Sequence, residues 1–296
     1  LNRLRREALE KLEWLRAVHE PVAFSMKPFS PTPHRVYLPD GKLPLRARFA
    51  NASLPEAAKQ CERVYLPYTT VPEKLAALQE EGFRVALDLP RGLFGMEQAL
   101  KQRLAEARDA GVTHVWAGNL GAAALAKELG MTVHGGFSLN VTNSAAIEWY
   151  AAFGLADTEL SFELALSAAA ALGGELPRGL VLYGRLPLML TRNCPAANSA
   201  KGCLHCTAAP ELTDRKGVHF PVQCYGACSE VLNSVPLWMA DRLAEVKQMD
   251  FGVLRFTTET REEQQRILEA YLRADGTPPA QGTFTRGLYY KGWVMG

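Results

Sequence analysis

The chain has 296 residues, 48% of them hydrophobic and 22% charged, with a formal net charge of +2. This composition is typical of a folded globular protein and excludes a disordered chain or a strongly basic one. No apolar run approaches the ~20 residues that a membrane-spanning helix needs. We therefore expect a cytoplasmic protein without a membrane partner. In that compartment, clustered cysteines bind metal or take part in redox chemistry more often than they form structural disulfides.

The first 44 residues differ from the rest of the chain. Between residues 2 and 19, apolar side chains recur every three or four positions among charged ones, which predicts an amphipathic helix. Residues 20–44 contain six prolines and should form an extended linker. The chain begins with Leu1 and enters a charged helix at once, so we expect it to be a piece of a longer protein.

From residue 45 to residue 296, short β-type runs alternate with helical patterns. Strands are expected at 46–51, 63–68, 84–90, 114–119, 132–140, 158–163, 179–184 and 251–259. Helices are expected near 54–60, 71–82, 95–110, 120–129, 143–153, 163–172, 235–248 and 260–274. Eight strand-then-helix units predict an α/β protein with a closed (β/α)8 TIM-type barrel, and no GxGxxG follows the first strand to favour a dinucleotide-binding fold.

A cysteine-rich insertion, 191–234, interrupts this pattern after the seventh strand. Five of the six cysteines lie in it, at Cys194, Cys203, Cys206, Cys224 and Cys228. A hairpin is expected from VHFPVQCY and EVLNS. Thiols gathered among turn residues are typical of zinc and iron–sulfur sites, and spacing alone favours neither. Because loops that follow the strands build the active face of such barrels, we expect the thiols at the mouth where substrates bind.

Polar side chains stand where several predicted strands end: Asn51, Asp88, Asn119, Asn140, Glu163, Arg185 and Arg255. Helix capping explains some of them, and we assign Asp88 and Asn119 to it. Arg185 follows a buried strand beside the cysteines, where its guanidinium would bind a carboxylate or phosphate, or else form an internal ion pair. Tyr183, late on the same strand, belongs by default to the core, with a ligand-facing position as the alternative.

Three segments carry a family resemblance. They are GGFSLNVTNSAAIEW around Asn140, TELSFELAL around Glu159, and LVLYGRLPLMLTRNCP, which ends in a cysteine and a proline. With the downstream FPVQC and NSVPLWMADRL, they resemble the collagenase-like proteins classified as peptidase family U32, from about residue 45 onward. The chain departs from the family signature at Tyr183, Gly184, Arg185 and Pro187, where His-Gly-Ala and an early cysteine are usual.

The resemblance implies a barrel whose insertion holds a 4Fe-4S cluster through Cys194, Cys203, Cys206 and Cys224, with Cys228 as a reserve ligand. It also implies oxygen-independent hydroxylation in RNA modification, with RNA as a partner and prephenate or another small anion as co-substrate. The chain looks most like the C-terminal barrel of long members similar to an rRNA cytidine hydroxylase. Its partner would then be the N-terminal barrel of the same longer chain.

On this reading the substrate-binding residues are Asn140, Glu163, Tyr183, Arg185 and Arg255. No catalytic residue is nominated. Two alternatives stay open. One is a collagenase-like peptidase, for which the sequence offers no nucleophile with a partnered base. The other is a non-catalytic barrel that a structural zinc stabilises and that supports a partner domain.

Overall fold

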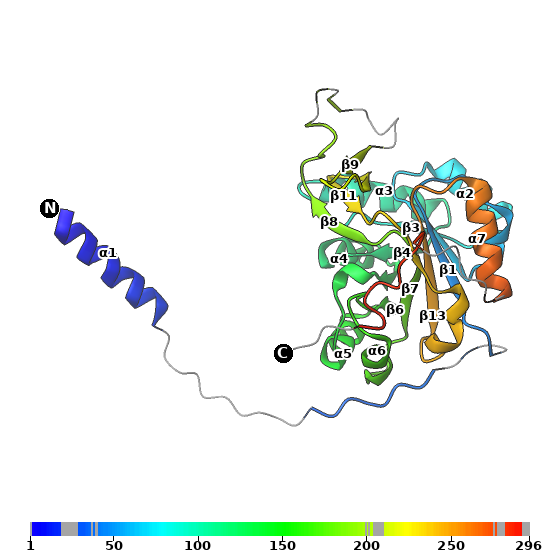
Figure 1. The fold of residues 1–296 in the computed structure, drawn as a ribbon, viewed down its shortest axis with the longest axis horizontal. Coiled ribbons are helices and arrows are strands. Elements are labelled where there is room, and N and C mark those ends of the chain that lie inside the picture. The colour runs from blue at the N-terminus through cyan, green and yellow to red at the C-terminus, as the bar shows by residue number, and fades with distance from the viewer. Residues whose placement is uncertain are drawn as a thin grey trace. The chain divides into compact units, whose positions relative to one another are not determined.

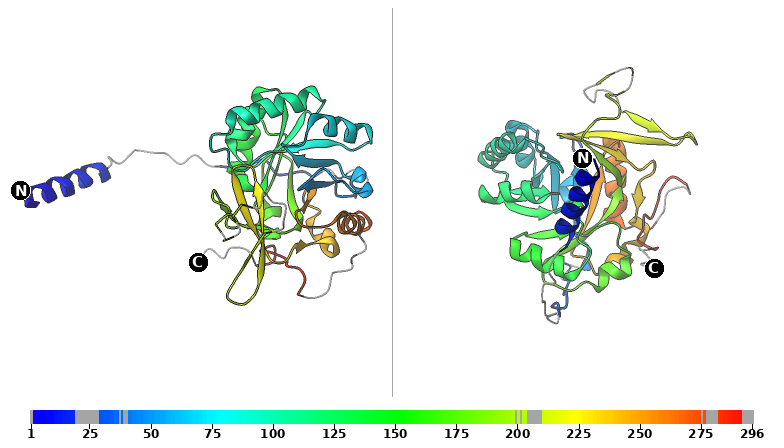
Figure 2. Two further views of the ribbon diagram at one scale, coloured as in Figure 1. Left: turned by 90° about the horizontal axis from the view of Figure 1, so that it is seen from above. Right: turned by 90° about the vertical axis from the view of Figure 1, so that its left-hand side faces the viewer.

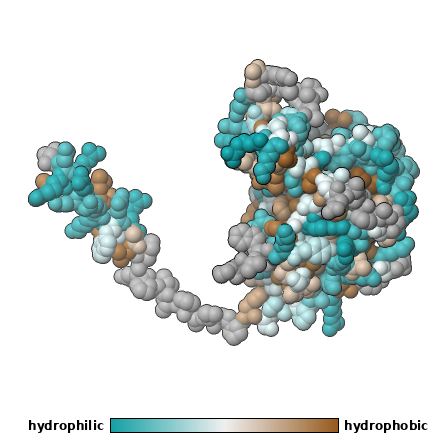
Figure 3. All heavy atoms as spheres, viewed as in Figure 1, coloured by the Kyte–Doolittle hydropathy of each residue, from teal (hydrophilic) through white to brown (hydrophobic). Residues whose placement is uncertain are grey.

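The computed structural model describes residues 2–18, 29–36, 38, 41–198, 200, 202–203, 210–274, 276 and 282–291. The chain divides into two compact units, Leu1–Ser30 and Pro31–Gly296. In the first, helix α1 (Asn2–Ala17) buries none of its residues, and its visible surface is mostly hydrophilic with a few hydrophobic side chains (Figure 3). Within the described ranges, no helix combines the length and the apolar character needed to cross a bilayer.

The second unit is a closed barrel of eight parallel strands (Figure 1). The strands are β1 (Leu45–Phe49), β2 (Arg63–Pro67), β3 (Val85–Asp88), β4 (His114–Ala117), β5 (Thr132–Gly135), β6 (Asp157–Glu159), β7 (Arg178–Gly184) and β13 (Phe251–Phe256). Each strand pairs with its neighbour in chain order, and the pairings of β6 with β7, β7 with β13 and β13 with β1 close the ring. The predicted (β/α)8 barrel is confirmed.

Helices lie between the strands and cover the barrel. They are the 3-10 helix η2 (Glu56–Gln60), α2 (Pro72–Glu80), α3 (Glu97–Asp109), α4 (Leu120–Glu128), α5 (Ser144–Phe153), α6 (Leu166–Ala171) and α7 (Arg261–Arg273). Asn119 caps α4 as predicted, since its side-chain oxygen accepts the backbone N–H of Ala122 at 2.8 Å. Thr260 and Glu263 form a capping box that fixes the start of α7.

Two predicted helices take another form. The segment 54–60 forms the short 3-10 helix η2. The segment 235–248 begins with β12 (Leu237–Trp238), which pairs antiparallel with β7, and continues as the 3-10 helix η4 (Ala240–Val246). The C-terminal segment packs beside η4, where the Tyr289 hydroxyl donates to the carbonyl of Val181 and Arg286 pairs with Asp241.

The insertion after β7 forms a separate four-stranded antiparallel sheet at one end of the barrel (Figures 1 and 2). Its strands are β8 (Pro187–Thr191), β9 (Glu211–Thr213), β10 (His219–Tyr225) and β11 (Cys228–Leu232), in the spatial order β8-β11-β10-β9. The predicted hairpin is confirmed as β10 and β11. Because β8 follows β7 directly, this sheet stands at the end of the barrel where the parallel strands finish.

The barrel interior holds a charged layer near the end where the strands begin. Arg46 of β1 makes two hydrogen bonds to Asp157 of β6, at 2.8 and 2.9 Å. His134 Nδ1 lies 2.7 Å from the same carboxylate, and its Nε2 lies 2.9 Å from Nδ1 of His114. Since an unpaired charge is costly in such an interior, these groups depend on one another.

His114 should make stability depend on pH. Burial, with Arg63 and His134 nearby, lowers the pKa of His114 from 6.5 to about 4. The unfolded chain therefore binds the proton first, and stability falls as the pH drops from 6.5 towards 4. The imidazole is only half-buried, so we expect a loss of about 1–2 kcal/mol after allowance for screening. The free energy of unfolding, measured in urea at several pH values in this range, should fall less steeply with decreasing pH for His114→Gln than for the parent chain. His219→Gln, at an exposed histidine, should show the same pH dependence as the parent chain.

Candidate functional site: the barrel mouth

A second charged layer lies under the mouth of the barrel, at the end where the strands finish. Arg48 of β1 is 2% exposed and makes two 2.9 Å hydrogen bonds from Nη2 to the carboxylate of Asp88, at the end of β3. Asp88 therefore binds an internal arginine, and the prediction that it caps a helix is wrong. Glu159 of β6 accepts hydrogen bonds from Trp116 Nε1 at 2.6 Å and from the backbone N–H of Phe137 at 3.1 Å.

The insertion contributes one carboxylate, that of Glu230, to this charged layer. Glu230 of β11 is fully buried and binds Arg91, in the loop after β3, at 2.6 Å, and Arg255 of β13. Burial alone would raise the pKa of Glu230, but Arg255 and Arg91 outweigh that effect and lower the pKa to about 2. The carboxylate thus stays ionised at neutral pH and fastens the insertion sheet to the barrel.

A cavity of about 230 Å³ opens above Phe137 at this mouth. It lies between the segments that follow β5 and β6 on one side and strand β8 on the other. Its lining comprises Arg91, Phe137, Ser138, Asn140, Ser161, Phe162, Glu163 and the β8 residues Pro187, Leu188, Met189 and Leu190. An adjoining hollow of about 360 Å³ shares Arg91, Ser138 and Leu190 with it. We call the two together the mouth cavity.

The structure brings two predicted binding residues together in the mouth cavity. Asn140 and Glu163 both line it, and both are exposed. Asn140 adopts a left-handed backbone with φ of 53°, which turns the chain at the end of the 3-10 helix η3 (Phe137–Leu139). Arg255 lies beneath, 4% exposed, with its guanidinium bound to Glu230 and to the carbonyl of Arg185.

The other two predicted binding residues have internal partners. The Arg185 guanidinium donates to the carbonyls of Asn233 and Ser234 and to the hydroxyl of Thr258, so it ties the end of the insertion to the end of β13. Tyr183 is 3% exposed, packs against other aromatic rings, and donates its hydroxyl to Glu259 at 3.0 Å. Tyr183 thus belongs to the core, the default expected for it, whereas Arg185 binds neutral carbonyl and hydroxyl groups instead of the acidic partner of an internal ion pair.

Two of the predicted metal ligands lie around one serine of the insertion sheet. Ser229 of β11 lies opposite Cys224 of β10 in the antiparallel ladder, and its side chain hydrogen-bonds the thiol of Cys194. Partial burial would raise the pKa of Cys194, but hydrogen bonds from Ala197 N–H, Ser229 and Ala196 N–H outweigh it and lower the pKa. A lowered pKa favours the thiolate, which is the form that binds metal, and hydrogen bonds to ligand sulfurs are among the features that tune iron–sulfur clusters.

The remaining cysteines of the insertion lie in different surroundings. Cys203 is exposed, and Cys206 lies outside the described residues. Cys228 is buried against the loop after β3, where Gly92 leaves room for its sulfur. Burial raises the pKa of Cys228. In the part of the chain that the structure describes, no three His, Cys, Asp or Glu side chains form a group that could hold a metal ion.

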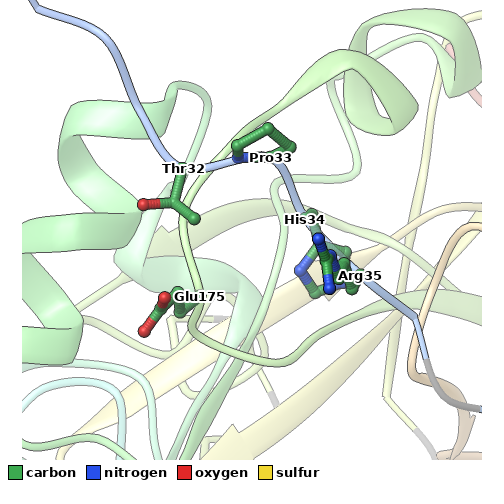
Figure 4. Close-up of a pocket in the computed structure, with 5 residues that line it drawn as sticks. All are labelled: Thr32, Pro33, His34, Arg35 and Glu175. Carbon is green, nitrogen blue, oxygen red and sulfur yellow. The ribbon is translucent and has the colours of Figure 1, made fainter.

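A further cavity, of about 390 Å³, lies at the opposite end of the barrel. Figure 4 shows the residues that line it, Thr32, Pro33, His34, Arg35 and Glu175. His34 Nε2 is 2.9 Å from Asp250, which precedes β13 and also accepts the backbone N–H of Arg178 at 2.7 Å. This is the end at which the strands begin, and in barrels of this type it contributes to stability while the other end carries the active site.

The sequence prediction missed the two residues that join the mouth to the insertion, Arg91 and Glu230. Arg91 directly follows the predicted third strand, LDLP, and this position at a strand end was the available signal. Glu230 follows Cys228 within the predicted hairpin and shows no pattern of its own. Its partners lie 139 and 25 positions away in the chain, so only the closed barrel brings them together.

Comparisons with known proteins find similarity among solved structures alone. No protein-family model matches the chain, and no curated protein matches it significantly. Among solved structures, a glycerol uptake operon antiterminator-related protein from Thermotoga maritima is similar at 16% identity. The match covers 47% of this chain and 82% of that one, with a TM-score of 0.34. The barrel and the mouth cavity of this chain are therefore defined by its own strand pairing and side-chain contacts.

Proposed function

We propose that this chain is an iron–sulfur barrel of the U32 type and part of an RNA-modifying enzyme that hydroxylates without oxygen. One observation carries the proposal. The sheet inserted after β7 makes different contacts on its two faces, because successive residues of a strand point to opposite sides. From β11, Glu230 reaches into the barrel mouth, while Ser229 contacts the Cys194 thiol on the other side.

Cys194, Cys203, Cys206 and Cys224 would hold the 4Fe-4S cluster in this proposal. The fit rests on the Cys194 thiolate, which backbone N–H groups and a serine stabilise, and on Cys224 across the ladder from that serine. When bound, such a cluster supplies one-electron transfer. The chain's own residues would do the rest. Asn140 and Ser161 offer hydrogen bonds to the substrate, and strand β8 gives the cavity an apolar wall with Leu188 to Leu190.

A peptidase function has less support in the described lining of the mouth cavity. Ser138 donates its hydroxyl to the carbonyl of Gly118 at 2.7 Å, and no histidine is among the residues that line the cavity. A hydrolytic serine requires an adjacent base, and the lining residues do not supply one with an imidazole. We therefore propose a hydroxylase. The alternative is a structural zinc site without catalytic activity, and metal analysis distinguishes the two.

Metal analysis of the anaerobically purified chain tests this proposal. We expect about four iron and four sulfide ions per chain, the content of a 4Fe-4S cluster held by four thiolates. Cys194→Ser and Cys224→Ser should each remove most of the iron, whereas Cys61→Ser, at a cysteine buried in the barrel core, should keep it. One zinc per chain without sulfide would instead indicate a structural metal.

The reaction itself is tested in cells. RNA from cells with and without the gene should differ in one hydroxylated nucleoside, and Cys194→Ser should behave like the deletion. Unchanged nucleoside composition across all RNA classes would contradict the RNA-modifying part of the proposal while leaving the cluster to be judged by its iron content.

A further inference from the structure

We infer that the barrel has a second ligand site, at the end opposite to the mouth, which binds a long-chain carboxylate of the fatty-acid type. The site is a groove of about 460 Å³ between the segment before β1, the 3-10 helix η4 and the end of α7. It shares no residue with the mouth cavity or with the cavity of Figure 4. The inference goes beyond the proposed function and does not depend on it.

The groove lies where the barrel strands begin. Leu45, the first residue of β1, lines it, and so does Lys247, shortly before the start of β13. Helix α7 follows β13 and returns to this end, so its last residue, Arg273, also lines the groove, with its guanidinium 3.4 Å from Glu269. The volume falls within the range of about 300–1,000 Å³ that is typical of small-molecule sites.

The deepest part of the groove is apolar. Leu45 and Tyr271 line it and belong to the buried core, at 6% and 2% exposure. The Tyr271 hydroxyl donates to the carbonyl of Leu182 at 2.6 Å and accepts the backbone N–H of Met239 at 2.8 Å. Because these two bonds occupy its polar atom inside the protein, Tyr271 can offer a ligand only its ring.

The walls of the groove are leucines with one side in the core and the other uncovered. Leu43, Leu243 and Leu272 are half-buried, pack against the core and line the groove. They come from three separate segments, so the apolar surface runs across the groove rather than along one helix. An alkyl chain that covers these side chains removes apolar surface from water, which is favourable.

Charged side chains at the rim favour an anionic head group on that chain. Lys42 and Lys247 are exposed, and the described residues give neither of them an ion-pair partner. Asp241 is the one carboxylate in the described lining, and it already forms two hydrogen bonds with Arg286, at 2.6 Å each. The rim therefore keeps a positive charge, which attracts a carboxylate.

This combination of surfaces selects among the possible occupants of an apolar groove. A neutral hydrocarbon would make no use of the two lysines. A basic amphipathic segment would be repelled by them, and α1, with five basic and three acidic side chains, is a segment of this kind. A carboxylate on an alkyl chain matches both parts, since its chain covers the leucines and its head group pairs with Lys42 and Lys247.

Calorimetric titration of the purified full chain, at low ionic strength and below micelle formation, tests the inference with three probes. Decanoate should bind. Decanol, which has the same chain length without the charge, should bind at least about 5-fold more weakly, because it forms no ion pair with the lysines. Acetate, which is the head group alone, should show no measurable binding. Added salt should weaken the binding of decanoate and leave that of decanol unchanged.

Two variants test the groove itself. Lys247→Gln should weaken decanoate binding about 3-fold and leave decanol binding unchanged, because an exposed ion pair contributes modestly. Ala244→Glu adds a carboxylate at an exposed position of the lining, and should weaken decanoate binding about 10-fold while the free energy of unfolding stays that of the parent chain. Lys216→Gln, in the exposed turn between β9 and β10, is the matched control and should bind decanoate normally.

Several results would overturn the inference. They are equal binding of decanoate and decanol, binding of neither, and full decanoate binding by Ala244→Glu. A dimer in sedimentation that Ala244→Glu dissociates and decanoate does not affect would assign the groove to a second copy instead. Binding to vesicles of anionic phospholipid without binding of free decanoate would assign it to a membrane surface. Because these measurements involve neither the cysteines nor the mouth cavity, iron content still tests the proposed function separately.

Discussion

Glu230→Gln should destabilise the chain by about 3–5 kcal/mol, because it removes the buried carboxylate that Arg91 and Arg255 share. The glutamine keeps the shape of the side chain but leaves two guanidinium groups in a buried site without a counter-ion. The free energy of unfolding, measured in urea, gives the size of the loss. Amide exchange should also become faster in β11, because the ion pairs of Glu230 hold the insertion sheet against the barrel.

Glu211→Gln is the control for this variant. Glu211 lies in the same insertion sheet, on β9, but is exposed and pairs with His219 at the surface. Exposed ion pairs contribute little, so its loss should stay within about 0.5 kcal/mol. Similar unfolding energies for the two variants would mean that the insertion sheet is held by other contacts, and the coupling between insertion and barrel would have to be abandoned.

Asp157→Asn should cost about 2–4 kcal/mol at the other end of the barrel. The substitution removes two hydrogen bonds between Arg46 and a buried carboxylate, and leaves Arg46, whose side chain is 7% exposed, with the more exposed carboxylate of Glu62 as its ion-pair partner. His134 loses its charged acceptor at the same time. The effect should appear as a lower denaturation midpoint with an unchanged dependence on urea concentration.

The matched control is Asp109→Asn at the end of α3. Asp109 pairs with Arg108 at 3.2 Å on the surface, and both side chains are well exposed. Its stability should be close to that of the parent chain. If Asp157→Asn were as mild as Asp109→Asn, the polar layer inside the barrel would be hydrated rather than sealed.

The barrel could be predicted from the sequence because each strand-then-helix unit is a local pattern. Runs such as RVALDLP and GLVLYG are typical of buried parallel strands, and the number and spacing of such runs predict a closed ring. The position of the insertion follows from the same count. The segment 235–248 differs from the predicted helix because β12 and the C-terminal segment, with Tyr289, cover part of the barrel near η4.

The charged interior could not be predicted in the same way. In β1, Arg46 and Arg48 alternate with apolar residues, which by itself indicates a strand with one face in water. In the closed ring that face points inward, and each arginine meets an aspartate that is 111 or 40 positions away. Asp88 was assigned to capping for the same reason, since a local pattern contains no information on a distant partner.

The candidate site shows the same division. The strand-end positions identified Asn140 and Glu163, which line the mouth cavity, but also Tyr183 and Arg185, whose polar groups are bound inside the protein. Position along a strand predicts which end a residue occupies, while the direction of its side chain depends on tertiary contacts.

X-ray absorption at the iron and zinc edges of the anaerobically purified chain tests the central claim most directly. We predict an iron edge whose nearest scatterers are sulfur atoms, with a second shell of iron at the short distance of a cluster. Cys194→Ser should abolish that signal, and Cys61→Ser should retain it. A zinc edge with four sulfur neighbours, or no metal signal in a folded chain, would contradict the account.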